Sequence, residues 1–424
     1  MKINSLAFFK KKFFIKELTH KKITHGLKKK LTESELLNQK IDFENILGCK
    51  IDRNIFENIL YNSLYCPFIN TLELNNRNYI QDLFLLSKGK LSKAVNHLFQ
   101  HNTKKKNYNT NEITSDIANQ IDKKGYVVLE NYFDSDFIKN IKNQLLEYKY
   151  KANSNFRYIN TLKNIKNKKT EYSVFQSNLT DKQLSKKSPI FKMISDLFIR
   201  DVAGNYFNTN PYVVEICAIY TKKKKLSSNE IHRSAQKFHY DQGHLKFVKV
   251  FVYLDDINIP SDGAHSFIES THENNFKLPI NKEAFEKSGI RKSADGIFTG
   301  PLKDNWVLSN FKKERIKNFC YPKGTIIIEN TTGLHRGNNC KTSDRNLLSF
   351  TYSLSAISSV PQERMPTIES TFPNKIDRDF QHLLPLIKSV NKYQNEIGRD
   401  FFTYRYTKLE KLIKRLLNKF YNSK

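Results

Sequence analysis

Residues 238–241 read Phe238-His239-Tyr240-Asp241 and stand just ahead of an apolar run, Phe247 to Leu254. Such a run, rich in valine and aromatic residues, predicts a buried strand. In an extended chain, side chains two residues apart point to the same side, so His239 and Asp241 are expected to converge on one point. An imidazole nitrogen and a carboxylate oxygen together suit a borderline metal such as iron(II). Taken alone, a His-x-Asp pattern is weak evidence, because the chain has 11 histidines.

A second pattern follows further along the chain. Gly324 to Asn330 predicts a strand, the next three residues a turn, and His335 opens another strand. Arg345 stands at the head of a further apolar run, Asn346 to Tyr352. Two histidines and a carboxylate on one face of a metal leave positions open for a cosubstrate and dioxygen. The guanidinium fork of Arg345 suits the distal carboxylate of a cosubstrate such as 2-oxoglutarate. The order, the spacing and the strand context together are far more specific than any one part.

The sequence around these patterns is typical of a β-rich domain. Short β-branched and aromatic runs alternate with turn residues from about Tyr212 to Ser355, without amphipathic helices between them, which favours a sandwich or barrel. The runs are Tyr212-Val213-Val214, Val248 to Leu254, Ser266-Phe267-Ile268, Thr325 to Ile328 and Leu347 to Leu354. A polar, lysine-rich insertion, from about Phe276 to Phe319, interrupts them, and loops of that length are usually functional or mobile.

Both ends of the chain are predicted to be helical. We divide it into a basic N-terminal region (1–110), a β-rich domain (111–360) and a C-terminal extension (361–424). Within the second part, Gly125 to Leu129 predicts an opening strand and Asn131 to Tyr150 a helix.

Two features of these ends leave functional alternatives open. The apolar stripe within Leu409 to Phe420 is expected to pack on the domain, with contact to a membrane surface or another subunit as the alternative. His97 and His101 are four residues apart and could share a helix face, but no third metal ligand lies nearby.

Composition limits the class of protein. The formal charge of +29 is spread along the chain, which favours a solvated basic surface; attraction to an anionic substrate, lipid or nucleic acid stays open. Five cysteines without a close pair argue against a disulfide framework and a structural zinc site, and suit a reducing, cytoplasmic compartment. No stretch approaches the length of a transmembrane helix. The oligomeric state does not follow from the sequence.

From about Ile117 to Leu354 the chain resembles the phytanoyl-CoA dioxygenase family of iron(II)/2-oxoglutarate oxygenases. Lys124 to Glu130 is similar to the family's opening strand, and His239-Tyr240-Asp241 to its metal-binding motif. Asp262-Gly263-Ala264 through His272 resembles its glycine turn, except that Glu269 replaces a usual proline and Thr271 a usual serine. The resemblance implies an α+β chain with a mainly β core, a double-stranded β-helix of the jelly-roll or cupin type, and helical additions at both ends.

By the same resemblance, His239, Asp241 and His335 would ligate iron(II), and Arg345 would bind 2-oxoglutarate. The implied enzyme is a dioxygenase that uses O₂ to hydroxylate an unactivated C–H bond of a small organic substrate, with release of succinate and CO₂. Halogenating relatives lack the metal carboxylate, so the presence of Asp241 favours hydroxylation or a related oxidation.

Several other residues compete for roles at such a site. His232, His244, His265 and His272 are alternative ligands, each of them disfavoured, and the resemblance implies that His272 belongs to a structural loop. Gln236, Lys237 and Arg336 could contact 2-oxoglutarate or an anionic substrate, or be solvated.

Two other functions stay open. One is a binding protein of the same fold without turnover. The other is an oxygenase acting on an anionic macromolecule, which is disfavoured because Arg345 to Thr351 does not match the RxNxTxR pattern of nucleic-acid demethylases.

Overall fold

The computed structural model describes most of the chain between residues 31 and 356. The described residues are 31–64, 79–80, 83–84, 87, 89–103, 106–152, 155–179, 188–224, 235–241, 243–274, 288, 291–292, 298–299 and 301–356. All of them belong to one unit, Leu31–Lys388. The predicted C-terminal stripe, Leu409 to Phe420, and His232 lie outside the described residues. In the part that is described, no helix combines the length and the apolarity needed to cross a bilayer.

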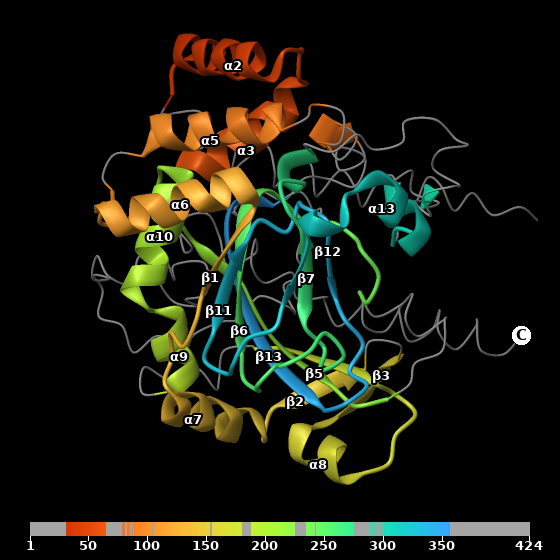
Figure 1. Cartoon of the computed structure of the whole chain (residues 1–424). Coiled ribbons are helices and arrows are strands. Elements are labelled where there is room, and N and C mark those ends of the chain that lie inside the picture. Colours follow the sequence, from red (N-terminus) through yellow and green to blue (C-terminus); the bar gives the residue numbers. More distant parts are fainter. Residues whose placement is uncertain are drawn as a thin grey trace, which may run out of the picture. The chain divides into compact units, whose positions relative to one another are not determined.

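A large antiparallel sheet of eight strands forms the centre of the fold (Figure 1). In spatial order its strands are β1 (Tyr126–Leu129), β11 (Ile326–Glu329), β6 (His244–Tyr253), β13 (Arg345–Ala356), β5 (Val213–Thr221), β4 (Val174–Asn178), β2 (Lys149–Ala152) and β3 (Asn155–Thr161). The central strands are almost wholly buried, and their valine and isoleucine runs fit the pleated surface.

A second, smaller sheet faces the first. Its strands are β10 (Ile316–Phe319), β7 (His265–Ile268) and β12 (His335–Gly337). The chain passes from one sheet to the other between β6 and β7 and again between β11 and β12. One buried cluster combines residues of both sheets, including Phe251, Tyr253 and Ile327 of the large sheet and Phe267 and Phe319 of the small one. The main core therefore lies between the two sheets.

Helices surround this core, and their ends are specified by local sequence (Figure 1). They are α2 (Glu33–Leu47), α3 (Arg53–Leu64), α5 (Lys90–Asn102), α6 (Glu112–Lys124), α7 (Ser135–Leu145), α8 (Leu162–Asn167), α9 (Pro189–Ile194), α10 (Leu197–Phe207) and α13 (Asp304–Asn310). Asn111 caps α6 in a capping box with Thr114, and Gly125 ends it with φ 94°. A hydrogen bond of 2.7 Å from Ser92 Oγ to the Leu245 carbonyl joins α5 to β6.

The structure confirms the predicted α+β composition with a large antiparallel sheet, and it corrects three details. The helix predicted for Asn131 to Tyr150 covers only α7, because the residues from Lys149 onward pair as β2. Strands β2, β3 and β4 were not predicted. The insertion was expected to reach Phe319, but Ile316–Phe319 forms strand β10, which pairs with β7. The division into three regions stays a prediction.

Candidate metal centre

The His-x-Asp segment is extended, and its side chains alternate as predicted. Phe238 and Tyr240 belong to a hydrophobic cluster with Leu334 and residues of the segment 302–311. The side chain of His239 points to the opposite side of the segment. Its backbone N–H and carbonyl each form a hydrogen bond of 2.9 Å with the backbone of His335. Asp241 is held by a bond of 2.8 Å from its N–H to the Thr331 carbonyl. The apolar neighbours thus hold this segment against β12 while the polar side chains face inward.

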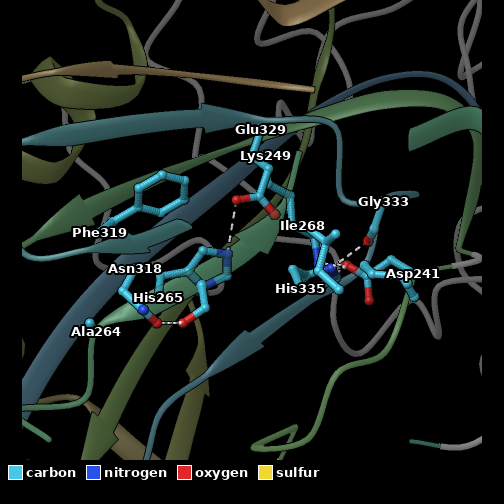
Figure 2. Close-up of polar contacts among 12 residues, drawn as sticks. Asp241, Lys249, Ala264, His265, Ile268, Asn318, Phe319, Glu329, Gly333 and His335 are labelled. Carbon is cyan, nitrogen blue, oxygen red and sulfur yellow. Dashed lines mark hydrogen bonds and ion pairs between the residues drawn. The ribbon is translucent and has the colours of Figure 1, made fainter. Parts of the chain in front are cut away.

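His239, Asp241 and His335 come together at one point. One ligand atom from each lies within 4.8 Å of the others, and Nε2 of His335 is 3.8 Å from Oδ2 of Asp241. Nδ1 of His239 lies 2.9 Å from the Lys237 carbonyl. Nδ1 of His335 lies 3.0 Å from the Gly333 carbonyl (Figure 2). A carbonyl only accepts, so each Nδ1 carries the proton and each Nε2 keeps a lone pair for a metal.

Burial and neighbouring charges favour the ligand forms of these groups. Burial lowers the pKa of His335 to about 3, so this imidazole is neutral. For Asp241, burial raises the pKa, but the adjacent Lys249 ammonium outweighs burial and holds the pKa well below its usual value. Lys249 donates to Oδ2 of Asp241 at 2.6 Å. Two nitrogen donors and one ionised carboxylate form a set that fits iron(II) among the divalent metals.

Arg345, the first residue of β13, is a buried cation with no carboxylate in contact among the described residues. Its side chain donates to the Gly263 carbonyl and, at 3.3 Å, to Oγ1 of Thr221. Nε is buried without a hydrogen-bond partner, and the residue is only 5% exposed. A Cβ atom at Gly337 would lie 3.5 Å from both terminal nitrogens. A buried guanidinium without a carboxylate partner among the described residues is suited to bind an anionic ligand, and its planar pair of N–H donors matches a carboxylate.

The other histidines considered from the sequence lie outside the triad. His244 is buried against Ser353, with Nδ1 3.1 Å from Oγ. His272 contacts the Asp122 carbonyl through Nε2 at 2.8 Å. His265 is buried beside the triad and paired with Glu329 at 2.9 Å.

The polar residues considered as ligand contacts have different surroundings. The guanidinium of Arg336 lies 4.4 Å from the centre of the Phe238 ring and 3.2 Å from Asp304, on the side away from the triad. Gln236 is buried, and its Oε1 has no hydrogen-bond partner within the described ranges. His97, on α5, is exposed.

Two residues at the site were missed by sequence reasoning, Lys249 and Glu329. They are cross-strand partners in β6 and β11, so their side chains lie on the same face of the sheet. A usable signal was present: each is a charged residue within or at the end of a buried apolar strand, where charge is rare unless it is paired or functional.

Comparison with known proteins finds only weak similarity to solved structures. No family model matches the chain, and no curated protein does. Among solved structures, HygX from Streptomyces hygroscopicus with nickel and 2-oxoglutarate bound is 18% identical, covering 56% of this chain and 86% of its own, with a TM-score of 0.37. The alpha-ketoglutarate-dependent epimerase SnoN from nogalamycin biosynthesis is 13% identical over 57% and 83%, with a TM-score of 0.38.

EctD from S. alaskensis, with 2-oxoglutarate and 5-hydroxyectoine, is 17% identical over 58% and 79%, also with a TM-score of 0.38. Because these TM-scores lie below 0.5, the likeness carries no argument about chemistry, which rests on the triad and Arg345.

Proposed function

We propose that the protein is an iron(II)- and 2-oxoglutarate-dependent dioxygenase that hydroxylates an unactivated C–H bond of a small organic substrate. One observation carries the proposal: a triad of two imidazoles and an ionised carboxylate lies near a buried guanidinium that contacts no carboxylate in the described part of the chain. Iron(II) and 2-oxoglutarate would supply the oxidising power, with O₂ consumed and succinate and CO₂ released.

The roles of the residues follow from their positions. His239, Asp241 and His335 would hold the metal, and Arg345 the distal carboxylate of 2-oxoglutarate. Arg345 lies over Gly337, which is two residues beyond His335 on β12. Two residues of a strand span about 7 Å, a length comparable to that of a five-carbon dicarboxylate. The site would therefore bind one end of the cosubstrate at the metal and the other at Arg345.

We also propose that the core is a double-stranded β-helix. The facing sheets, and a chain that alternates between them along β6, β7, β11, β12 and β13, support this topology. The His239–His335 bridge adds the His-x-Asp segment to the edge of the small sheet at β12. Asp241 favours hydroxylation over halogenation, because halogenation needs its coordination position for halide.

A non-catalytic binding protein of the same fold is the second candidate. The observation that favours it is the ion pair between Lys249 and Asp241, which occupies one oxygen of the carboxylate. The metal can still use the other oxygen, so the pair is compatible with both functions.

The test is the visible spectrum of purified protein loaded anaerobically with iron(II), recorded as 2-oxoglutarate is added. We expect a weak metal-to-ligand charge-transfer band that is lost in His335→Ala and kept in His97→Ala, a control at an exposed histidine on α5. Absence of the band, together with no affinity for 2-oxoglutarate by calorimetry, would leave the binding-protein function. If the band appears, substrates would be screened by succinate release.

A further inference from the structure

A ring of hydrogen bonds lies on the face of the large sheet opposite to Lys249. It begins at Lys246 of β6, which is three residues before Lys249 and therefore points to the other face. The Lys246 ammonium donates to the Tyr206 hydroxyl of α10 at 2.9 Å and to the Glu273 carboxylate. Nδ2 of Asn330, the residue after β11, donates to the same hydroxyl at 2.8 Å. One tyrosine hydroxyl thus joins a buried ion pair to the end of β11.

Thr332 closes the ring. Its hydroxyl donates to Oδ1 of Asn330 at 2.7 Å and accepts from the backbone N–H of Glu273 at 2.7 Å. The backbone N–H of Thr332 also donates to Oδ1 of Asn330, at 3.1 Å, and because an N–H can only donate, this bond fixes the orientation of the amide. The members are at most 8% exposed: Lys246, Tyr206, Glu273, Asn330 and Thr332. A closed and buried network of this kind favours one arrangement of its members.

The backbone on both sides of the ring is constrained. Glu273 has φ 53°, in the left-handed region, where a residue with a side chain is strained unless its surroundings hold it. Across from it, a Cβ atom at Gly333 would lie 2.4 Å from the Phe267 ring and 3.0 Å from the backbone nitrogen of His272. The turn between β11 and β12 is therefore packed tightly against the segment that carries Glu273.

The same turn supplies two backbone acceptors to the triad. The Thr331 carbonyl accepts from the backbone N–H of Asp241 at 2.8 Å. The Gly333 carbonyl accepts from Nδ1 of His335 at 3.0 Å (Figure 2). The ring holds the side chains of the residues that alternate with Thr331 and Gly333 in the turn. A shift of the ring would therefore move both acceptors and the two triad residues that they position.

We propose that Tyr206, Asn330 and Thr332 are positioning residues of the metal centre, which act on it through the turn between β11 and β12. This inference rests on the proposed function, and it gives a role to a buried polar network that the reaction itself does not use. Outer partners of metal ligands typically contribute about 10- to 100-fold to metal affinity. A ring with only a structural role would stabilise the fold and leave the affinity for the metal unchanged.

The test titrates the full, metal-free chain with cobalt(II), whose visible spectrum reports both binding and ligand geometry. Thr332→Val keeps the shape of the side chain but removes the hydroxyl that closes the ring. It is expected to bind cobalt about tenfold more weakly and to shift the d–d bands. Thr332→Ser retains the hydroxyl and is expected to restore the affinity and the spectrum of the original protein. Ser177→Ala is a control for stability alone: it removes a buried hydroxyl that donates to the Lys149 carbonyl, between β4 and β2, and should change neither.

A second readout does not involve the metal. The N–H of Asp241, which donates to the turn, is expected to exchange with solvent faster in metal-free Thr332→Val than in Thr332→Ser or Ser177→Ala. Unchanged cobalt affinity and spectrum in a folded Thr332→Val variant would overturn the inference while leaving the proposed function intact. If Thr332→Val does not fold, Tyr206→Phe, which removes only a hydroxyl, decides by the same criteria. If the original protein itself binds no cobalt, the proposed function and the inference fail together.

Discussion

Replacing Arg345 by methionine tests the anion site most directly, because the change removes the charge and leaves the aliphatic stem. The guanidinium is buried, and among the residues that the structure describes it contacts no carboxylate and its Nε has no hydrogen-bond partner. A bidentate carboxylate would form two charge-assisted hydrogen bonds, each worth about 1.5–3 kcal/mol. Allowing for the desolvation of both ions, we expect a loss of about 3–4 kcal/mol, which is about 150- to 1,000-fold in the dissociation constant of 2-oxoglutarate.

Calorimetric titration of 2-oxoglutarate into manganese-loaded protein measures this loss. Arg345→Lys is the matched variant: it keeps a positive charge without the planar fork, so its affinity should fall between those of the original protein and Arg345→Met. The affinity for the metal should not change, since Arg345 contacts none of the triad residues. The reasoning is refuted if Arg345→Met binds metal and still binds 2-oxoglutarate as tightly as the original protein.

Three further predictions concern the triad and the buried charges. His239→Ala is expected to abolish turnover and to weaken metal binding measured by calorimetry, whereas full activity would contradict the assignment. Burial lowers the pKa of His244, His265 and His335 to about 3. Unfolding therefore takes up three protons as the pH falls below 6.5, while Glu329, with a pKa raised to about 8, releases one. Unfolding therefore binds a net two protons near pH 5. The free energy of unfolding of the metal-free protein should fall by about 2.7 kcal/mol for each pH unit by which the pH is lowered there, measurable by urea unfolding; equal stability at about pH 7 and 5 would contradict this. Glu273→Gln breaks a buried ion pair with Lys246 and should destabilise the fold by about 3–5 kcal/mol, against less than about 1 kcal/mol for Glu269→Gln at the more exposed pair with Lys317.

Local patterns in the sequence predicted the parts of the site that depend on neighbouring residues. The convergence of His239 and Asp241 follows from the two-residue period of an extended segment, and the packing of Phe238 and Tyr240 on the other side agrees with it. The start of β13 at Arg345 follows from the apolar run behind it. The antiparallel β-rich core was likewise predictable from alternating short runs and turns.

Features that depend on strand register could not be predicted. The pairing of Lys249 with Glu329, and of His265 with Gly337, is set by how distant strands align, and a shift of one residue would reverse every side chain. Strand β10, Ile-Lys-Asn-Phe at 316–319, is too short and too polar to stand out within a lysine-rich insertion. It becomes a strand because β7 offers an edge with which it can pair.

The reciprocal backbone bridge between His239 and His335 has a consequence for how the protein would acquire the proposed metal. The two residues are remote in sequence, and β6, β7, β10 and β11 all lie between them in the chain. An unfolded or half-folded chain would offer only the isolated His-x-Asp pair, which holds a metal weakly. The complete ligand set forms only when that long loop closes, a slow step governed by chain entropy. Part of the binding free energy of the metal then stabilises the folded state, so a cell short of the metal would hold a less stable and more easily degraded protein.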